Sequence, residues 1–179
     1  MCRWIMWSGV LATNKADRHI VITGFMGTGK TTIGRLVARQ VKRNFVDMDD
    51  LIVERAGKPI PAIFAEDGEI AFRMMERNIL EEIARTGGQV IATGGGALVA
   101  DINRQLMKQS TFLVCLTATP DIIEARIGQD TGRPLARNWQ DLLIKRAPAY
   151  ADIPIQVDTS HRQPNQVAEE IVRLWQSSM

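Results

Sequence analysis

Short apolar runs rich in β-branched residues alternate along the chain with longer segments in which apolar residues recur at helical spacing. The short runs predict buried strands over His19–Phe25, Asn44–Asp49, Gln89–Thr93, Thr111–Ala118 and Ile155–Asp158. The longer segments predict helices over Thr31–Arg43, Leu51–Ala56, Pro59–Ala65 and Glu69–Arg85, from Thr119-Pro120 onward, and from Pro164 onward. This alternation is typical of an α/β fold with a parallel sheet covered on both faces.

The helix predicted over Glu69–Arg85 divides into two faces. Its apolar face is expected to point inward and consists of Met75, Ile79, Leu80 and Ile83. Its polar face is expected to point outward and consists of Glu76, Arg77, Glu81 and Glu82.

Two segments lack either period. We interpret residues Met1–Arg18 as an N-terminal extension that precedes a single domain over residues 19–179. The segment Gln129–Asn138 contains Gly132 and Pro134 and is predicted to be a mobile loop of the kind that forms lids in kinases.

The composition limits the possible functions. The chain has 179 residues, of which 45% are hydrophobic, so that one domain with a proper core is expected. A net charge of +2 without a long basic run, and the absence of a long apolar stretch, argue against nucleic-acid and membrane partners. Cys2 and Cys115 form no disulfide framework, which fits a reducing cytoplasm, and Cys115 is expected to be buried. We expect His19 and His161 to be solvated or loop residues.

The strongest chemical signal follows the first predicted strand. The segment Gly24-Phe25-Met26-Gly27-Thr28-Gly29-Lys30-Thr31 fits the pattern G-x-x-x-x-G-K-[ST] and leads into a predicted helix. Glycines allow successive backbone N–H groups to surround phosphate oxygens, and the helix N-terminus adds partial positive charge. Lys30 can reach the β- and γ-phosphates, and the Thr31 hydroxyl can bind Mg²⁺. These residues predict ATP binding.

A dinucleotide-binding oxidoreductase is an alternative from another class. Gly27 and Gly29, followed by Asp49, imitate its fingerprint and its ribose-binding acid. Thr32 stands at the third small position, however, and the Lys30-Thr31 pair has no function in that fold. We therefore favour the phosphate loop.

Three further segments bear on the substrate. Asp47 and Asp49 are expected on the same side at the end of the second strand, where one could hold Mg²⁺ through water and the other could orient or deprotonate a hydroxyl; a solvated turn is the alternative. Arg73 and Glu76 could form a surface salt bridge, or Glu76 could orient Arg73 toward a carboxylate. Gly94-Gly95-Gly96 could be a flexible connection or a place where a ligand approaches the backbone.

These motifs together resemble shikimate kinases. The resemblance rests on GFMGTGKTTIG, on FVDMDD, on the run from Ile63-Phe64 through Asp67-Gly68-Glu69 to FRMMER, on the glycine triplet, on Gly132-Arg133-Pro134-Leu135 and on Arg146-Ala147-Pro148-Ala149-Tyr150. It covers roughly His19 to Trp175 and implies a three-layer α/β/α P-loop fold with a five-stranded parallel sheet, order 2-3-1-4-5, and a short lid. The implied activity is ATP-dependent phosphorylation of the 3-hydroxyl of shikimate, in the chorismate pathway of aromatic amino-acid biosynthesis.

The resemblance also implies roles for individual residues. ATP would contact Gly27, Thr28, Gly29, Lys30, Thr31, Thr32, Arg126, Arg133, Arg162 and Pro164. Mg²⁺ would be bound by Thr31 and, through water, by Asp47. Shikimate would be bound by Asp49, Arg73, Gly95, Gly96 and Arg146, with the arginines on its carboxylate. Lys30, Asp49 and Arg133 would take part in catalysis, with Arg133 swinging from the lid onto the phosphates.

The chain departs from the family pattern at the lid. The interval from Arg133 to Arg146 is shorter than is usual by about half a dozen residues, comparable to one to two helical turns, and Ala136 and Ala149 replace leucines. A trimmed lid would exclude water less well, which affects turnover more than binding. One alternative is a non-catalytic module that binds nucleotide or shikimate but has a disabled lid. Another is a P-loop kinase for a different metabolite, such as gluconate or a nucleoside monophosphate. A cytoplasmic monomer with ATP and shikimate as its ligands is expected.

Overall fold

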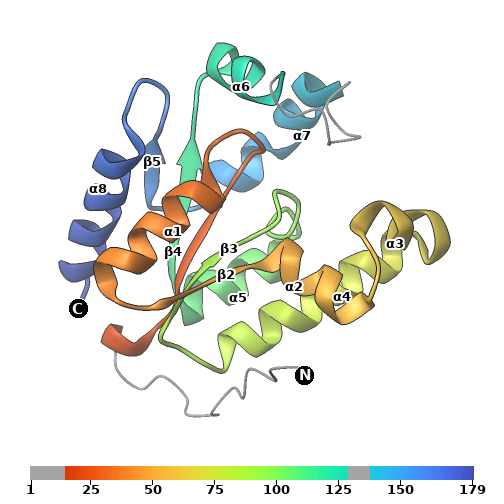
Figure 1. The fold of residues 1–179 in the computed structure, drawn as a ribbon, viewed down its shortest axis with the longest axis horizontal. Coiled ribbons are helices and arrows are strands. Elements are labelled where there is room, and N and C mark those ends of the chain that lie inside the picture. Colours follow the sequence, from red (N-terminus) through yellow and green to blue (C-terminus); the bar gives the residue numbers. More distant parts are fainter. Residues whose placement is uncertain (1–14, 129–137) are drawn as a thin grey trace.

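A five-stranded parallel sheet in the order β2-β3-β1-β4-β5 forms the centre of the computed structural model, which describes residues 15–128 and 138–179 (Figure 1). The strands are β1 (Ile20–Gly24), β2 (Asn44–Asp47), β3 (Gln89–Ala92), β4 (Phe112–Thr117) and β5 (Gln156–Asp158). The central strand β1 is buried along its whole length because helices cover both faces of the sheet. The predicted fold class and strand order are confirmed.

The helices form two layers around this sheet. Their bounds are α1 (Lys30–Val41), α2 (Met48–Ala56), α3 (Ile60–Glu66), α4 (Gly68–Ala84), α5 (Asp101–Ser110), α6 (Pro120–Ile127), α7 (Trp139–Ala151) and α8 (Pro164–Gln176), after a short 3₁₀ turn, η1 (Lys15–Asp17). The apolar residues of α1 and α8 pack on one face of the sheet, and those of α2, α4 and α5 pack on the other (Figure 1). The fold therefore has two apolar cores, one on each face.

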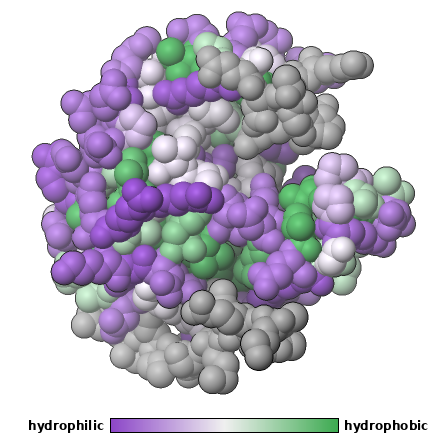
Figure 2. Space-filling view, viewed as in Figure 1, coloured by the Kyte–Doolittle hydropathy of each residue, from purple (hydrophilic) through white to green (hydrophobic). Residues whose placement is uncertain are grey.

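The face shown in Figure 2 is mostly hydrophilic, but apolar side chains gather on α3 and the start of α4. Phe64, Ile70 and Met74 are the exposed large apolar residues there. Cys115 is buried as predicted, and burial raises the pKa of its thiol to about 12. In the described residues, no helix is both long and apolar enough to cross a bilayer.

The end of the second strand differs from the prediction. The strand stops at Asp47, and Asp49 lies in the first turn of α2. The Asp47 side chain accepts a hydrogen bond from the backbone N–H of Asp49 (3.1 Å) and so caps the helix. The expectation that strand alternation aligns the two carboxylates is therefore wrong.

Helix α5 is an element that the apolar pattern does not predict. Its buried residues are Asn103, Arg104 and Met107, so that two of the three inward side chains are polar. The segment is polar overall, so its few apolar residues do not stand out as a helical face, although it is a regular helix.

Two predicted segments lie partly or wholly outside the described residues. Most of the expected extension, residues 1–14, and most of the expected lid, residues 129–137 with Arg133 and Ala136, are outside them. At the end of the expected extension, the Asp17 carbonyl accepts from Gly88 N (2.7 Å), and Arg43 donates to the carbonyls of Ala16 and Arg18. The domain boundary at residue 18 stays a prediction.

His19 lies in the connection just before β1, as one of the two expected alternatives has it, but it is fully buried, so the expectation of a solvated residue is wrong. The backbone N–H of Gln89 donates to its Nδ1 (3.1 Å), which leaves the ring proton on Nε2, 2.9 Å from the Thr86 hydroxyl. Burial, together with the nearby charge of Arg43, lowers the pKa of His19 from 6.5 to about 4. The folded protein therefore holds this ring in its neutral form.

We expect the free energy of unfolding to fall by roughly 3 kcal/mol as the pH is lowered from 6.5 to about 4. Over this range His19 is protonated in the unfolded chain but stays neutral in the folded protein, because its pKa is lower there. Above pH 6.5 this contribution is complete. Urea unfolding of the parent chain and of His19→Gln at several pH values tests this contribution. In His19→Gln this part of the pH dependence of the unfolding free energy should disappear. His161→Gln, an exposed change, is the control, and parallel curves for the parent and His19→Gln would contradict the assignment.

Candidate active site

The candidate site lies at the carboxyl ends of the parallel strands, where open α/β sheets bind their ligands. The phosphate loop follows β1, Asp47 ends β2, and the glycine triplet follows β3. Neighbouring strands therefore bring together segments that are far apart in the sequence.

The phosphate loop has the backbone conformation that its glycines were expected to provide. The backbone φ angles of Gly27 and Gly29 are 78° and 90°, values that residues other than glycine rarely adopt. Gly29 directly precedes α1. Lys30 Nζ donates to the Phe25 carbonyl (3.0 Å), and the Thr28 hydroxyl donates to the same oxygen (2.8 Å). The loop is thus closed by its own side chains, with Lys30 lying across it.

Thr31 and Asp47, the residues expected near Mg²⁺, are in direct contact. The Thr31 hydroxyl donates to Asp47 Oδ2 at 2.8 Å. The described residues contain no group of three or more His, Cys, Asp or Glu side chains that could form a closed metal cage. This arrangement fits Mg²⁺, which proteins usually hold with one or two side chains while phosphate and water complete the shell.

The residues expected near adenine meet at the loop after β5. Arg126 on α6 donates to the Gly27 carbonyl (3.1 Å) and, through its other Nη, to the Thr159 carbonyl (2.7 Å). Arg162 pairs with Glu170 (2.5 Å), and Pro164 begins α8. Arg126 therefore ties the phosphate loop to the segment that carries Arg162 and Pro164.

Asp49 faces the glycine triplet although it lies on α2. A Cβ atom added at Gly94 would lie 2.6 Å from Asp49 Oδ1 and 3.2 Å from Glu76 Oε1. Any side chain at position 94 would therefore displace the two carboxylates. The structure thus places the Asp49 carboxylate directly beside the glycine triplet.

The Arg73–Glu76 pair is more than a surface salt bridge. Arg73 Nη1 donates to Glu76 Oε2 at 2.6 Å, and the Glu76 side chain is only 2% exposed, so its predicted outward position is wrong. Burial raises the pKa of Glu76, and the charge of Asp49 adds to this, whereas Arg73 and Arg146 oppose it. Burial alone would lower the pKa of Arg73, but the carboxylates of Glu76 and Glu69 outweigh it and leave that pKa raised. Glu76 thus orients Arg73.

Arg146 reaches the same triplet from α7. Arg146 is buried, and its Nη1 would lie 3.5 Å from a Cβ atom added at Gly95. A Cβ atom added at Gly96 would lie 2.6 Å from Arg73 Nη1. Two guanidinium groups from different helices therefore lie beside adjacent glycines. Together they can bind a carboxylate beside these glycines.

Sequence reasoning missed one side chain in this region. The Tyr150 hydroxyl donates to the Gly95 carbonyl at 2.6 Å, and burial raises its pKa to about 12 although Arg146 opposes the shift. Its position at the end of the Arg146-Ala147-Pro148-Ala149-Tyr150 motif was the available signal. Arg133 lies outside the described residues and is not placed.

Comparisons with known proteins agree with this geometry. A family model described as shikimate kinase matches residues 26–176. The shikimate kinase of Geobacter sulfurreducens is 41% identical over 171 residues, covering 92% of this chain and 93% of the relative. Among solved structures, shikimate kinase from Acinetobacter baumannii in complex with shikimate has a TM-score of 0.83 at 34% identity, covering 92% of this chain and 96% of that chain. The shikimate kinase of Aquifex aeolicus has a TM-score of 0.79 at 29% identity, covering 89% and 96%.

Proposed function

The chain belongs to the shikimate kinase family, and we propose that its site transfers the γ-phosphate of ATP to the 3-hydroxyl of shikimate. The observation that carries this proposal is the approach of Arg73 and Arg146 to adjacent glycines beside Asp49, next to a phosphate loop. A neutral sugar would bring no negative charge to these two guanidinium groups, so it would be bound less well than an anionic acceptor. Because the chain belongs to a kinase family, the alternative of a dinucleotide-binding oxidoreductase is not supported.

The donor side of the reaction rests on the phosphate loop. The backbone N–H groups of Gly27–Thr32 would surround the phosphates, and Lys30 would leave the Phe25 carbonyl to neutralise charge on the transferring group. Thr31 and Asp47 would hold Mg²⁺, which when bound neutralises phosphate charge. Arg126, Arg162 and Pro164 would border the adenine, and Arg133 would reach the phosphates from the lid.

The acceptor side rests on charge complementarity. Arg73 and Arg146 would bind the shikimate carboxylate, with Gly95 and Gly96 against the ring, and so aim the 3-hydroxyl at the γ-phosphate. Asp49 would hold this hydroxyl and accept its proton as the new bond to phosphorus forms and the bond to the leaving oxygen of ADP breaks. The products are shikimate 3-phosphate and ADP. We propose that the protein acts as a cytoplasmic monomer.

A coupled assay of ADP release with a panel of acids and sugars tests the proposal. We expect Mg²⁺-dependent turnover on shikimate, and little on gluconate or nucleoside monophosphates. Activity on gluconate without activity on shikimate would overturn the substrate assignment. Tight binding of ATP and shikimate without turnover would instead favour a binding module with a trimmed lid.

For Arg73→Leu we expect KM for shikimate to rise by roughly 10- to 100-fold, because a charge-assisted bidentate contact is lost, while KM for ATP changes by less than about twofold. Arg73→Lys, which keeps the charge but not the fork, should fall between the parent and Arg73→Leu. Arg77→Leu removes an arginine one turn along α4 that pairs with Glu81, and serves as the control. Equal losses for both substrates would indicate a structural role.

A further inference from the structure

Two side chains of α5 donate hydrogen bonds to the loop that follows β3, residues 94–100. Asn103 Nδ2 donates to the Ala97 carbonyl (3.0 Å), and Arg104 Nη1 donates to the next two carbonyls, at 3.1 and 3.0 Å. Three consecutive carbonyl groups are therefore satisfied by side chains and not by a regular element. Because buried carbonyls need such partners, these contacts hold the loop in one conformation.

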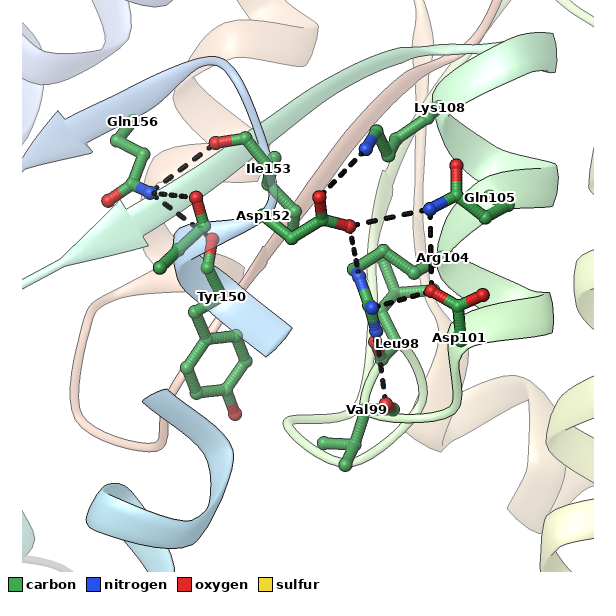
Figure 3. A network of polar contacts seen from close by, with 11 residues as sticks. Leu98, Val99, Asp101, Arg104, Gln105, Lys108, Tyr150, Asp152, Ile153 and Gln156 are labelled. Atoms are coloured by element: carbon green, nitrogen blue, oxygen red, sulfur yellow. Dashed lines mark hydrogen bonds and ion pairs between the residues drawn. The ribbon is translucent and has the colours of Figure 1, made fainter. Parts of the chain in front are cut away.

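The same guanidinium reaches the end of α7. Arg104 Nε donates to Asp152 Oδ2 and Nη2 donates to Asp101 Oδ1, both at 2.7 Å (Figure 3). The Arg104 side chain is only 10% exposed, whereas its partners Asp152 and Asp101 are 39% and 72% exposed. Hydrogen bonds from Arg104 and then Lys108 hold the pKa of Asp152 below its usual range, which keeps it ionised. Figure 3 shows the guanidinium between the loop carbonyls and the two carboxylates.

Helix α7 is also the helix that carries Arg146. Arg146 precedes Asp152 by six residues, about 9 Å along a helix axis. A second contact connects α7 to the loop, because the Tyr150 hydroxyl donates a hydrogen bond to the Gly95 carbonyl. The Arg104 bridge and the Tyr150 contact together fix how far Arg146 lies from the glycines.

We infer that Arg104 is a positioning residue for the acceptor: its bridge between the Gly94–Ala100 loop and Asp152 sets the spacing between Gly95 and the Arg146 guanidinium. This inference rests on the proposed function, because that spacing defines the shikimate pocket. The nucleotide side is held separately, by Arg126 on the Gly27 carbonyl. Loss of the bridge should therefore weaken shikimate binding and leave ATP binding nearly unchanged.

The test compares Arg104→Lys, Asp152→Asn and Lys108→Met with the parent chain by steady-state kinetics and thermal unfolding. A lysine cannot reach both the loop carbonyls and Asp152, so we expect Arg104→Lys to raise KM for shikimate by about tenfold, with KM for ATP changed by less than about twofold. Asp152→Asn should give a smaller rise of the same kind. Lys108→Met removes the other cation bound to Asp152 (3.1 Å) but leaves the bridge, so both KM values should stay within about twofold.

If Arg104 had a purely structural role, Arg104→Lys would have a lower Tm but unchanged KM values at a temperature where the variant is folded. This result would overturn the inference. Equal rises in the KM values for shikimate and ATP would also overturn it. If Arg104→Lys does not fold, Asp152→Asn decides by the same comparison, because the Asp152 side chain is 39% exposed and tolerates substitution. Turnover of shikimate by the parent chain is measured first, so that failure of the proposed function is seen separately from failure of the bridge.

Discussion

Replacing Lys30 with alanine is expected to lower kcat by about a thousandfold while the Tm stays close to that of the parent chain. The ammonium group lies across the phosphate loop, where Nζ reaches the Phe25 carbonyl, and can turn toward a transferring phosphoryl group without any change in the fold. Positive charge fixed at that point stabilises the transition state more than the ground state, so kcat should fall more than KM rises. Coupled kinetics and thermal unfolding measure both effects.

Arg39→Ala is the matched control for Lys30→Ala, because it removes an exposed cation from the same helix. We expect its kcat to stay within about twofold of the parent value. A Lys30→Ala variant with near-normal kcat, or one whose loss of rate follows a loss of folded protein, would refute the role given to Lys30.

Replacing Asp49 with asparagine is expected to lower kcat by at least about a hundredfold. Asparagine keeps the size of the side chain and its fit beside Gly94, but it cannot accept the proton of the acceptor hydroxyl. Shikimate binding, measured by calorimetry in the presence of ADP, should weaken much less than kcat falls.

Asp50→Asn is the control for Asp49→Asn, since it changes an exposed carboxylate at the next position of α2. Its rate should be close to that of the parent chain. Near-normal turnover by Asp49→Asn, or an equal loss in the Asp50 variant, would contradict the assignment of the acceptor hydroxyl to Asp49.

Local patterns in the sequence predicted the fold and the conformation of the phosphate loop well. The phosphate loop is a contiguous motif whose glycines adopt the expected backbone conformation, and the apolar runs identify every strand of the sheet to within a few residues. Thr31, in the first turn of α1, and Asp47, at the end of β2, are also in contact, as two residues expected at one Mg²⁺ would be.

Polar groups inside the protein account for most of what the sequence could not show. Glu76 is buried with Arg73, a neighbour on the same helix, as its partner, and His19 is buried with Gln89 and Thr86, which are distant in sequence. Hydrophobic periodicity treats such residues as surface positions.

Local capping and polar helix faces account for the other errors. Asp47 ends its strand early by capping α2, which moves Asp49 from a strand onto a helix. Helix α5 escaped detection because Asn103 and Arg104 occupy its inner face. In each case a side-chain hydrogen bond, which no apolar pattern records, determines the local structure.

A crystal structure of the chain with ADP and shikimate would test the proposed site most directly. This site should hold the ADP phosphates on Gly27–Thr32 and the shikimate carboxylate between the guanidinium groups of Arg73 and Arg146, with a ring hydroxyl on Asp49. Shikimate bound elsewhere, or both arginines directed to solvent with the space beside Gly95 and Gly96 empty at saturating ligand, would contradict it.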